Sequence, residues 1–171
     1  MKTFISCFII LFLFLGCTKQ KTAPLHKLTL SEHGINGINH ITPYNRSFIS
    51  SKLLGYEIAL YNKFENQTTQ SLMRVSYEGQ EIMLLLPSQQ TKEEDATVES
   101  IIITSKYVKN LLGLEIGTPL KRELFMACTE NKNEILCKEN PQSNISWIFT
   151  KTNSDTPKLL EIIWTKNSDS L

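Results

Sequence analysis

The chain has 171 residues, 41% of them hydrophobic, with 18 lysines and arginines against 17 aspartates and glutamates. This balance leaves no basic excess to neutralise phosphates, so nucleic acid is not an expected partner. The length beyond the first segment suits a single domain with one core.

The first sixteen residues have the pattern of a targeting segment. Lys2 precedes an apolar run of twelve residues from Phe4 to Leu15. A helix needs about 20 residues to cross a bilayer core, whereas a charged start before a short apolar run is typical of a secretory signal peptide. A buried core helix would show a polar face, and this run has only Ser6 and Cys7. We therefore expect removal of residues 1–16.

The end of this run resembles a bacterial lipobox with Cys17 as the acceptor of diacylglycerol and of an amide-linked acyl chain such as palmitate. The match is imperfect, because Phe14 and Leu15 stand where leucine and a small residue are usual. A signal without lipid and an incidental cysteine is the alternative. Each buried methylene contributes about 0.8 kcal/mol, so three chains would anchor firmly. Thr18, rather than aspartate, after the cysteine indicates the outer membrane, facing the periplasm.

Removal of the signal also removes Lys2. The chain after residue 16 then has 17 basic residues, one fewer than 18, and 17 acidic residues, so its formal net charge is zero. Residues 17–27 then form a lipidated tether, which is polar and has one proline and no periodicity. A single domain is expected at 28–171, and its first residues, LTLSE, suit a short strand.

Two similar phrases occur in the domain. GINHITPYNRSF at 37–48 and GLEIGTPLKREL at 113–124 share Gly, Thr-Pro and Arg at the same offsets. Each Thr-Pro pair predicts a helix start, because threonine can cap a free backbone N–H and proline at the first helical position has none to lose. The first helix is expected to end near Gly55.

The first two segments after this helix, 56–64 and 71–77, have a period of two. Together with the apolar segments that follow them, they predict an antiparallel meander. A polar loop at 88–97 is expected to interrupt it. The four predicted strands are 56–64, 71–77, 81–87 and 98–105.

The second helix is predicted from an apolar face after Thr118. Three further strands are expected after it, at 133–139, 143–151 and 159–166. The helical face has the spacing i, i+4, i+7 and i+8 at Leu120, Leu124, Ala127 and Cys128.

The predicted fold class is therefore α+β, an antiparallel sheet with two short helices. Two tandem helix-plus-meander repeats, about 33–105 and 109–166, are a further hypothesis. The repeat hypothesis has little statistical support, because the two phrases share only four residues and Thr-Pro is a common helix cap.

Cys128 and Cys137 are the cysteines that remain once Cys7 leaves with the signal and Cys17 carries lipid. In an oxidising periplasm they most simply form a disulfide. Free or catalytic thiols are the alternative, although a redox pair usually reads C-x-x-C and eight residues intervene here. Closing a loop of this size contributes roughly 2.5–3 kcal/mol.

The chain resembles the RpoE-regulated lipoprotein family, whose members are envelope lipoproteins controlled by the envelope-stress sigma factor, with a domain of no assigned activity. The resemblance covers residues 28–165 and implies a lipidated Cys17, a paired Cys128 and Cys137, and no catalytic residues. It is carried, in order, by LSEHGINGINHITPYNRSFISSKLLGYEI, LLGLEIGTPLKRELF, the two cysteines, ISWIFTK and LEIIW.

No residue pattern indicates catalysis. The histidines, His26, His33 and His40, do not have zinc-site spacing. The acids at 93–95 are adjacent, as on a solvated face, whereas paired catalytic carboxylates stand across a cleft. Nucleophile-elbow, zinc-protease, P-loop and dinucleotide motifs do not occur. We therefore expect no enzyme activity, metal or cofactor.

Four other residues have two interpretations each. Trp147 and Trp164 lie within predicted strands, where core packing is the simpler reading and an exposed anchor for a partner is the alternative. Arg46 and Arg122 have matching places near the expected helix starts. They either fix the turn, which we favour, or bind an anion.

The sequence thus favours a non-enzymatic outer-membrane lipoprotein linked to envelope stress, held by its lipid and facing the periplasm. Its sheet face would bind an envelope protein or peptidoglycan. The alternative is a periplasmic hydrolase acting on an envelope component, which would need a cleft gathering His33, His40 and the acids at 93–95. A structural role without a discrete partner is the third reading.

Overall fold

The computed structural model describes residues 27–65, 68–88, 95–151 and 156–166. The expected signal peptide, the lipidated Cys17, most of the tether and His26 lie outside these residues and stay predictions. None of the described helices is long and apolar enough to span a membrane.

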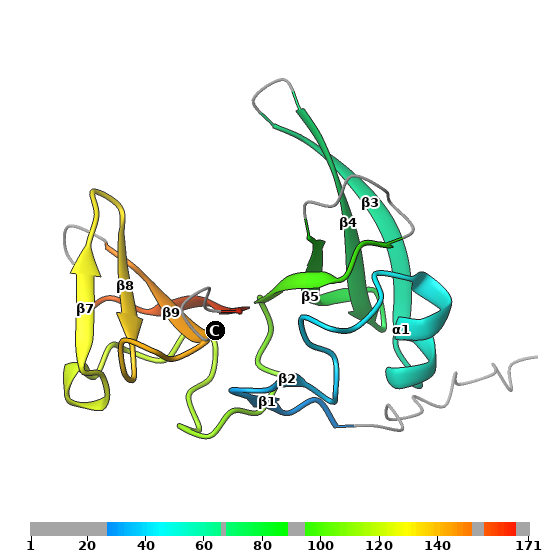
Figure 1. Cartoon of the computed structure of the whole chain (residues 1–171). Coiled ribbons are helices and arrows are strands. Elements are labelled where there is room, and N and C mark those ends of the chain that lie inside the picture. The colour runs from blue at the N-terminus through cyan, green and yellow to red at the C-terminus, as the bar shows by residue number, and fades with distance from the viewer. Residues whose placement is uncertain (1–26, 66–67, 89–94, 152–155, 167–171) are drawn as a thin grey trace, which may run out of the picture.

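Two four-stranded antiparallel meanders form one eight-stranded sheet, in the order β3-β4-β5-β6-β10-β9-β8-β7 (Figure 1). The two meanders join where β6 pairs with β10, with Ile103 opposite Ile162 and Ile101 opposite Trp164. The first comprises β3 (Glu57–Glu65), β4 (Thr68–Tyr77), β5 (Gln80–Pro87) and β6 (Val98–Ile103). The second comprises β7 (Ala127–Glu130), β8 (Glu134–Lys138), β9 (Ile145–Thr150) and β10 (Leu159–Thr165).

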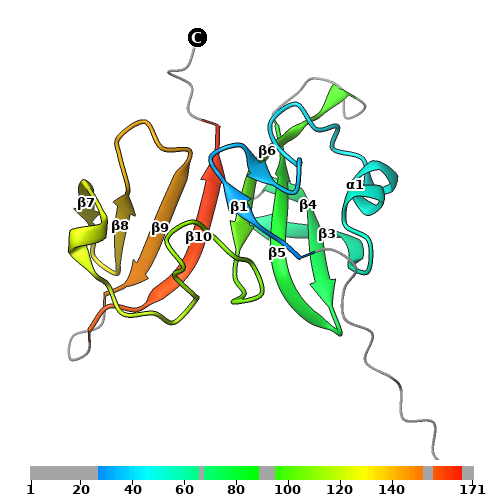
Figure 2. The same cartoon turned by 90° about the horizontal axis from the view of Figure 1, so that it is seen from below.

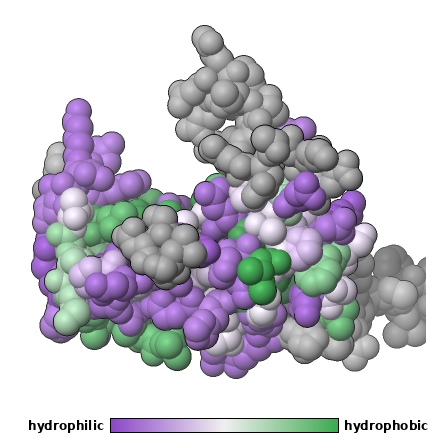
Figure 3. Space-filling model, viewed as in Figure 1, coloured by the Kyte–Doolittle hydropathy of each residue, from purple (hydrophilic) through white to green (hydrophobic). Residues whose placement is uncertain are grey.

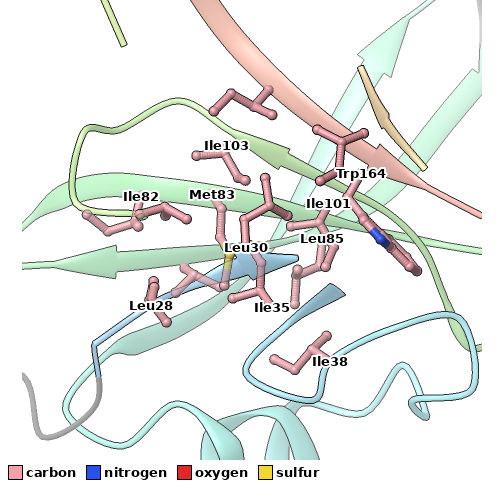
Figure 4. Packing of buried hydrophobic residues seen from close by; sticks show 14 of the residues in the cluster. Leu28, Leu30, Ile35, Ile38, Ile82, Met83, Leu85, Ile101, Ile103 and Trp164 are labelled. Atoms are coloured by element: carbon pink, nitrogen blue, oxygen red, sulfur yellow. The ribbon is translucent and has the colours of Figure 1, made fainter. Parts of the chain in front are cut away.

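A short hairpin covers the middle of one face of this sheet (Figure 2). It consists of β1 (Leu30–Ser31) and β2 (Gly34–Ile35). Apolar side chains from the hairpin and its flanks point toward the central strands, and together they form the core (Figure 4). The buried partners shown there are Leu28, Leu30, Ile35 and Ile38 on the hairpin side, and Ile82, Met83, Leu85, Ile101, Ile103 and Trp164 on the sheet side.

The helix α1 (Arg46–Lys52) lies beside β3 and buries Ile49 in the core. Its N-cap is Asn45, whose side chain accepts a hydrogen bond from the Phe48 N–H at 3.1 Å. The predicted cap, Thr42, is wrong: its hydroxyl accepts from the Asn39 N–H at 2.9 Å. Pro43 forms a β-bridge with Thr97. The backbone at 42–44 is thus used in sheet-like pairing, so the helix starts later than predicted.

The second predicted helix is absent from the described residues. The Thr118 hydroxyl accepts from the Glu115 N–H at 3.1 Å, and Pro119 bridges Lys158. Only a single 3₁₀ turn, η3 (Arg122–Leu124), follows before β7. The four residues of the predicted apolar face lie in different elements. Leu120 is in irregular chain and Leu124 in the 3₁₀ turn, and both pack on the core. Ala127 and Cys128 are in β7.

The α+β class with two helices is therefore wrong. The described chain is mainly antiparallel β, an eight-stranded sheet plus a two-stranded hairpin with one short α-helix. The predicted strand segments are all present, whereas β2 and β7 are not predicted. The domain limits and the tandem repeats at about 33–105 and 109–166 stay predictions.

Candidate functional site

The sheet has a second apolar face, opposite the hairpin. One row of facing residues crosses six strands and is aliphatic at three neighbouring positions, Leu84, Ile102 and Ile163. These three residues are flanked by Arg74, opposite Leu84, and by Ser146, opposite Ile163. Beyond Arg74 the row ends at Ala59 of β3. A solvated face of an antiparallel sheet is usually polar, so this composition is unusual.

We call this surface the outer sheet face. Beside the central row it carries further aliphatic side chains, including Leu86 and Leu136, which are half-buried like the three at the centre of the row. Leu72 and Ile148 are buried on the same face, yet they lie outside the core cluster on the hairpin side. The outer sheet face is therefore a second apolar layer. In the view of Figure 3, hydrophobic residues reach the surface mainly on the half that carries β7, β8 and β9.

Polar groups flank the aliphatic centre of the outer sheet face. The side chain of Arg74 is exposed. The hydroxyls of Ser100 and Thr165 hydrogen-bond one another at 2.9 Å across β6 and β10. An apolar centre with polar groups at its edge is the composition of protein interaction surfaces.

A second candidate is an open pocket of about 460 Å³ on the loop after β6. We call it the lysine pocket. Two buried residues, Val108 and Leu114, anchor the loop in the core on either side of its tip. It is lined by Lys27, Lys106, Tyr107, Val108, Lys109, Asn110, Gly113, Leu114 and Glu115.

Backbone and side-chain hydrogen bonds hold this loop in shape. Lys109 pairs with the chain before β1, donating from its N–H to the Leu28 carbonyl at 3.0 Å. Its carbonyl accepts from the Leu30 N–H at 2.7 Å. The Asn110 side chain closes the tip, since its Nδ2 donates to the Leu114 carbonyl at 2.6 Å and its Oδ1 accepts from the Leu114 N–H at 3.1 Å. The pocket therefore joins segments about 80 residues apart in sequence.

The lysine pocket concentrates positive charge. Lys109 lowers the pKa of Lys27, first because the two amino groups lie within hydrogen-bonding reach and then because their charges repel. Glu115 is the acid among the lining residues. The side-chain ion pairs found within the described residues join Glu130 to Arg122 and to Lys151, and neither includes a lysine of this pocket.

His33 and His40 line a third, smaller pocket of about 110 Å³ together with Glu32. The Glu32 carboxylate is used structurally: it accepts from the Ser143 hydroxyl at 2.7 Å and from the Asn144 N–H at 2.8 Å. These bonds connect the hairpin to the loop between β8 and β9.

The cleft required by the hydrolase reading is not formed by the described residues. Asp95 is exposed and does not line the histidine pocket, and residues 93–94 lie outside the described ranges. Groups of three or more metal-ligating side chains are not found within those ranges.

The other residues singled out in the sequence have structural places. Cys128 and Cys137 form a disulfide between directly paired positions of β7 and β8. Trp147 and Trp164 are buried in the core, as expected. Arg122 pairs with Glu130, whereas Arg46 begins α1, so the two arginines do not share one role.

The fold is that of an antiparallel β-sheet protein already seen in a solved structure, the uncharacterised protein YfeY from Escherichia coli. The two chains are 20% identical and superpose with a TM-score of 0.61, over 82% of this chain and 100% of that one. At this identity the similarity shows the fold alone and assigns no activity. No protein-family model and no curated protein matches the sequence.

Proposed function

We propose that the protein is a lipid-anchored module of the bacterial outer membrane, facing the periplasm, that binds another envelope protein through its outer sheet face. The anchor is Cys17, on the strength of the signal-like segment before it. The binding role rests on one observation, the aliphatic row of Leu84, Ile102 and Ile163 across the outer sheet face.

The chemistry of this surface favours a protein partner over peptidoglycan. Burial of aliphatic surface contributes about 25 cal/mol per Å², and a partner strand or helix with apolar side chains could supply the matching surface. Peptidoglycan is rich in hydroxyl, amide and carboxyl groups, which would lose hydrogen bonds to water against such a face.

A non-enzymatic role is part of the proposal. It is supported by the use of the Glu32 carboxylate in hydrogen bonds to Ser143 and Asn144 and by the small volume, about 110 Å³, of the pocket that His33 and His40 line. The link to envelope stress rests on the family resemblance of the sequence.

Site-specific cross-linking in the intact envelope tests the binding role. Photoreactive residues are placed at Arg74 and Ser146, which flank the three aliphatic residues of the row. Controls outside this row are placed at the exposed Ile41 and Lys121. We expect one discrete protein adduct from the first pair, identified by mass spectrometry, and none from the controls.

The adduct should also be lost when Cys17→Ser releases the protein from the membrane. Adducts of equal yield from all four positions would indicate non-specific contact. The absence of any adduct from Arg74 and Ser146 would remove the binding role.

A further inference from the structure

The lysine pocket lies where the chain enters the domain. Lys27 is the first described residue and lines the pocket. Lys27 is ten positions after Cys17 in the sequence, which limits the distance between the two to about 35 Å. If Cys17 carries the proposed lipid, the tether enters the domain at this pocket, so the membrane surface is within its reach.

The side chains at this place suit a lipid interface. Tyr107 is 46% exposed, and Leu111, at the tip of the loop, is 78% exposed. An aromatic ring with a polar end, an exposed aliphatic residue and lysines with long apolar stems are the residue types found where proteins meet headgroups. Two hydrogen bonds between Asn110 and Leu114 close the turn that presents Leu111.

The lysine pocket is more positively charged than the rest of the chain. Lys27, Lys106 and Lys109 stand against Glu115, an excess of two positive charges, whereas the chain after residue 16 is balanced overall. Clustered ammonium groups attract phosphates, and each lysine near an anionic membrane contributes about 1 kcal/mol.

We propose that the lysine pocket binds the phosphate groups of anionic lipids in the membrane that carries the anchor. The inference rests on the proposed lipid at Cys17. Docking at this point would orient the domain on the membrane, and it involves residues distinct from those of the outer sheet face.

Lysine footprinting of the full lipidated chain tests this inference. The protein is reconstituted in phosphatidylcholine vesicles with or without phosphatidylglycerol and treated with an amine-acetylating reagent, and each lysine is quantified by mass spectrometry. We expect Lys27, Lys106 and Lys109 to be acetylated about fivefold more slowly when phosphatidylglycerol is present, the factor that corresponds to about 1 kcal/mol. High salt should remove the difference. Exposed Lys121 and Lys132 are internal controls and should not change.

A matched pair of variants refines the test. Lys106→Gln with Lys109→Gln should abolish the protection of Lys27, whereas Lys121→Gln with Lys132→Gln, which removes the same charge, should leave it intact. Equal protection in both kinds of vesicle would overturn the inference. Protection by free glycerol phosphate without vesicles would also overturn it, since the pocket would then bind a soluble phosphate.

The intact mass of the protein separates the two proposals. A mass without lipid on Cys17 removes the proposed anchor and, with it, the membrane as the source of the phosphate. A lipidated mass with no protection of the three lysines removes only the further inference.

Discussion

Gly34 adopts a backbone conformation that few other residues could adopt. Its φ is +99°, and a Cβ there would stand 2.0 Å from the Ile38 carbonyl oxygen. That oxygen cannot easily move, because it accepts from the Ile35 N–H at 3.0 Å. The hairpin can therefore close over the core only with glycine at this position.

We expect Gly34→Ala to lower the free energy of unfolding by at least about 3 kcal/mol, from strain at positive φ together with the clash. Gly37→Ala is the matched control, since its φ is +79° and nothing lies within 4 Å of its added Cβ. It should cost only the conformational strain, about 1–2 kcal/mol. Urea denaturation measures both values. Equal losses would show that the clash at Gly34 is relieved by movement of the hairpin.

Glu139, in the connection between β8 and β9, has a raised pKa, chiefly because it is partly buried and also because the charge of Glu32 is near. A carboxyl whose pKa is higher in the folded than in the unfolded state favours folding when protonated. This contribution is present at low pH and is lost as the pH rises from the unfolded value through the raised folded value.

Glu139→Gln should therefore make the protein more stable than the wild type at neutral pH, and the advantage should vanish as the pH falls below the usual range of glutamate. Thermal unfolding across this pH range measures the difference. The same change at exposed Glu134 reports the effect of removing one negative charge. An advantage of Glu139→Gln that does not depend on pH would contradict the assignment.

At the scale of elements, β7 is the least supported strand of the second meander. It lies at the edge of the sheet, pairs with β8 alone, and has no fully buried residue. The disulfide between Cys128 and Cys137 joins it to β8, whose Cys137 lies opposite the core residue Trp147. The disulfide therefore attaches an exposed edge strand to the core.

Replacement of both cysteines by alanine should lower the free energy of unfolding by about 2.7 kcal/mol, the chain-entropy value for a loop of this length. Hydrogen exchange should rise first in β7 (Ala127–Glu130), since local opening begins where few apolar contacts exist. Reduction of the wild type should give the same result. Unchanged protection of β7 would show that its pairing with β8 suffices.

The elements differ in how well the sequence predicts them. The strands of the first meander are predicted because alternating or aliphatic runs of six or more residues favour strands. β7 is not predicted, because an exposed edge strand needs no apolar alternation and Ala127–Glu130 has none. The Thr-Pro pairs are misread as helix caps, since the same threonine hydroxyl can instead close a turn by accepting from the N–H three residues earlier, as Thr42 does from Asn39.

The candidate sites are only partly readable from the sequence. The run Met83-Leu84-Leu85-Leu86 does not alternate, which already indicates a strand that is apolar on both faces. The lysine pocket is different, because it depends on the bridge between Thr29 and Lys109. Contacts between segments this distant in sequence leave no local pattern.

At the scale of the whole molecule, the sheet separates two apolar layers. The hairpin, α1 and the segment from 104 to 125 contribute core residues on one side. The outer sheet face lies on the other side, and its aliphatic residues stand next to core residues along the same strands. Ile102 and Ile103 are such neighbours: Ile103 is fully buried, whereas Ile102 is half-buried. They provide a matched comparison of the two layers.

We expect Ile103→Thr to lower the free energy of unfolding by about 2–4 kcal/mol, since it leaves a cavity and buries a hydroxyl in the core. Ile102→Thr should cost about 1 kcal/mol or less, because its side chain already contacts solvent in the free protein. The same variant should, however, weaken cross-linking from Arg74 and Ser146 to the envelope partner, as expected for a residue at the centre of an interface. Urea denaturation and adduct yield measure the two effects separately. If Ile102→Thr were as destabilising as Ile103→Thr and left the adduct yield unchanged, the outer sheet face would be a second packed interior layer rather than a binding surface.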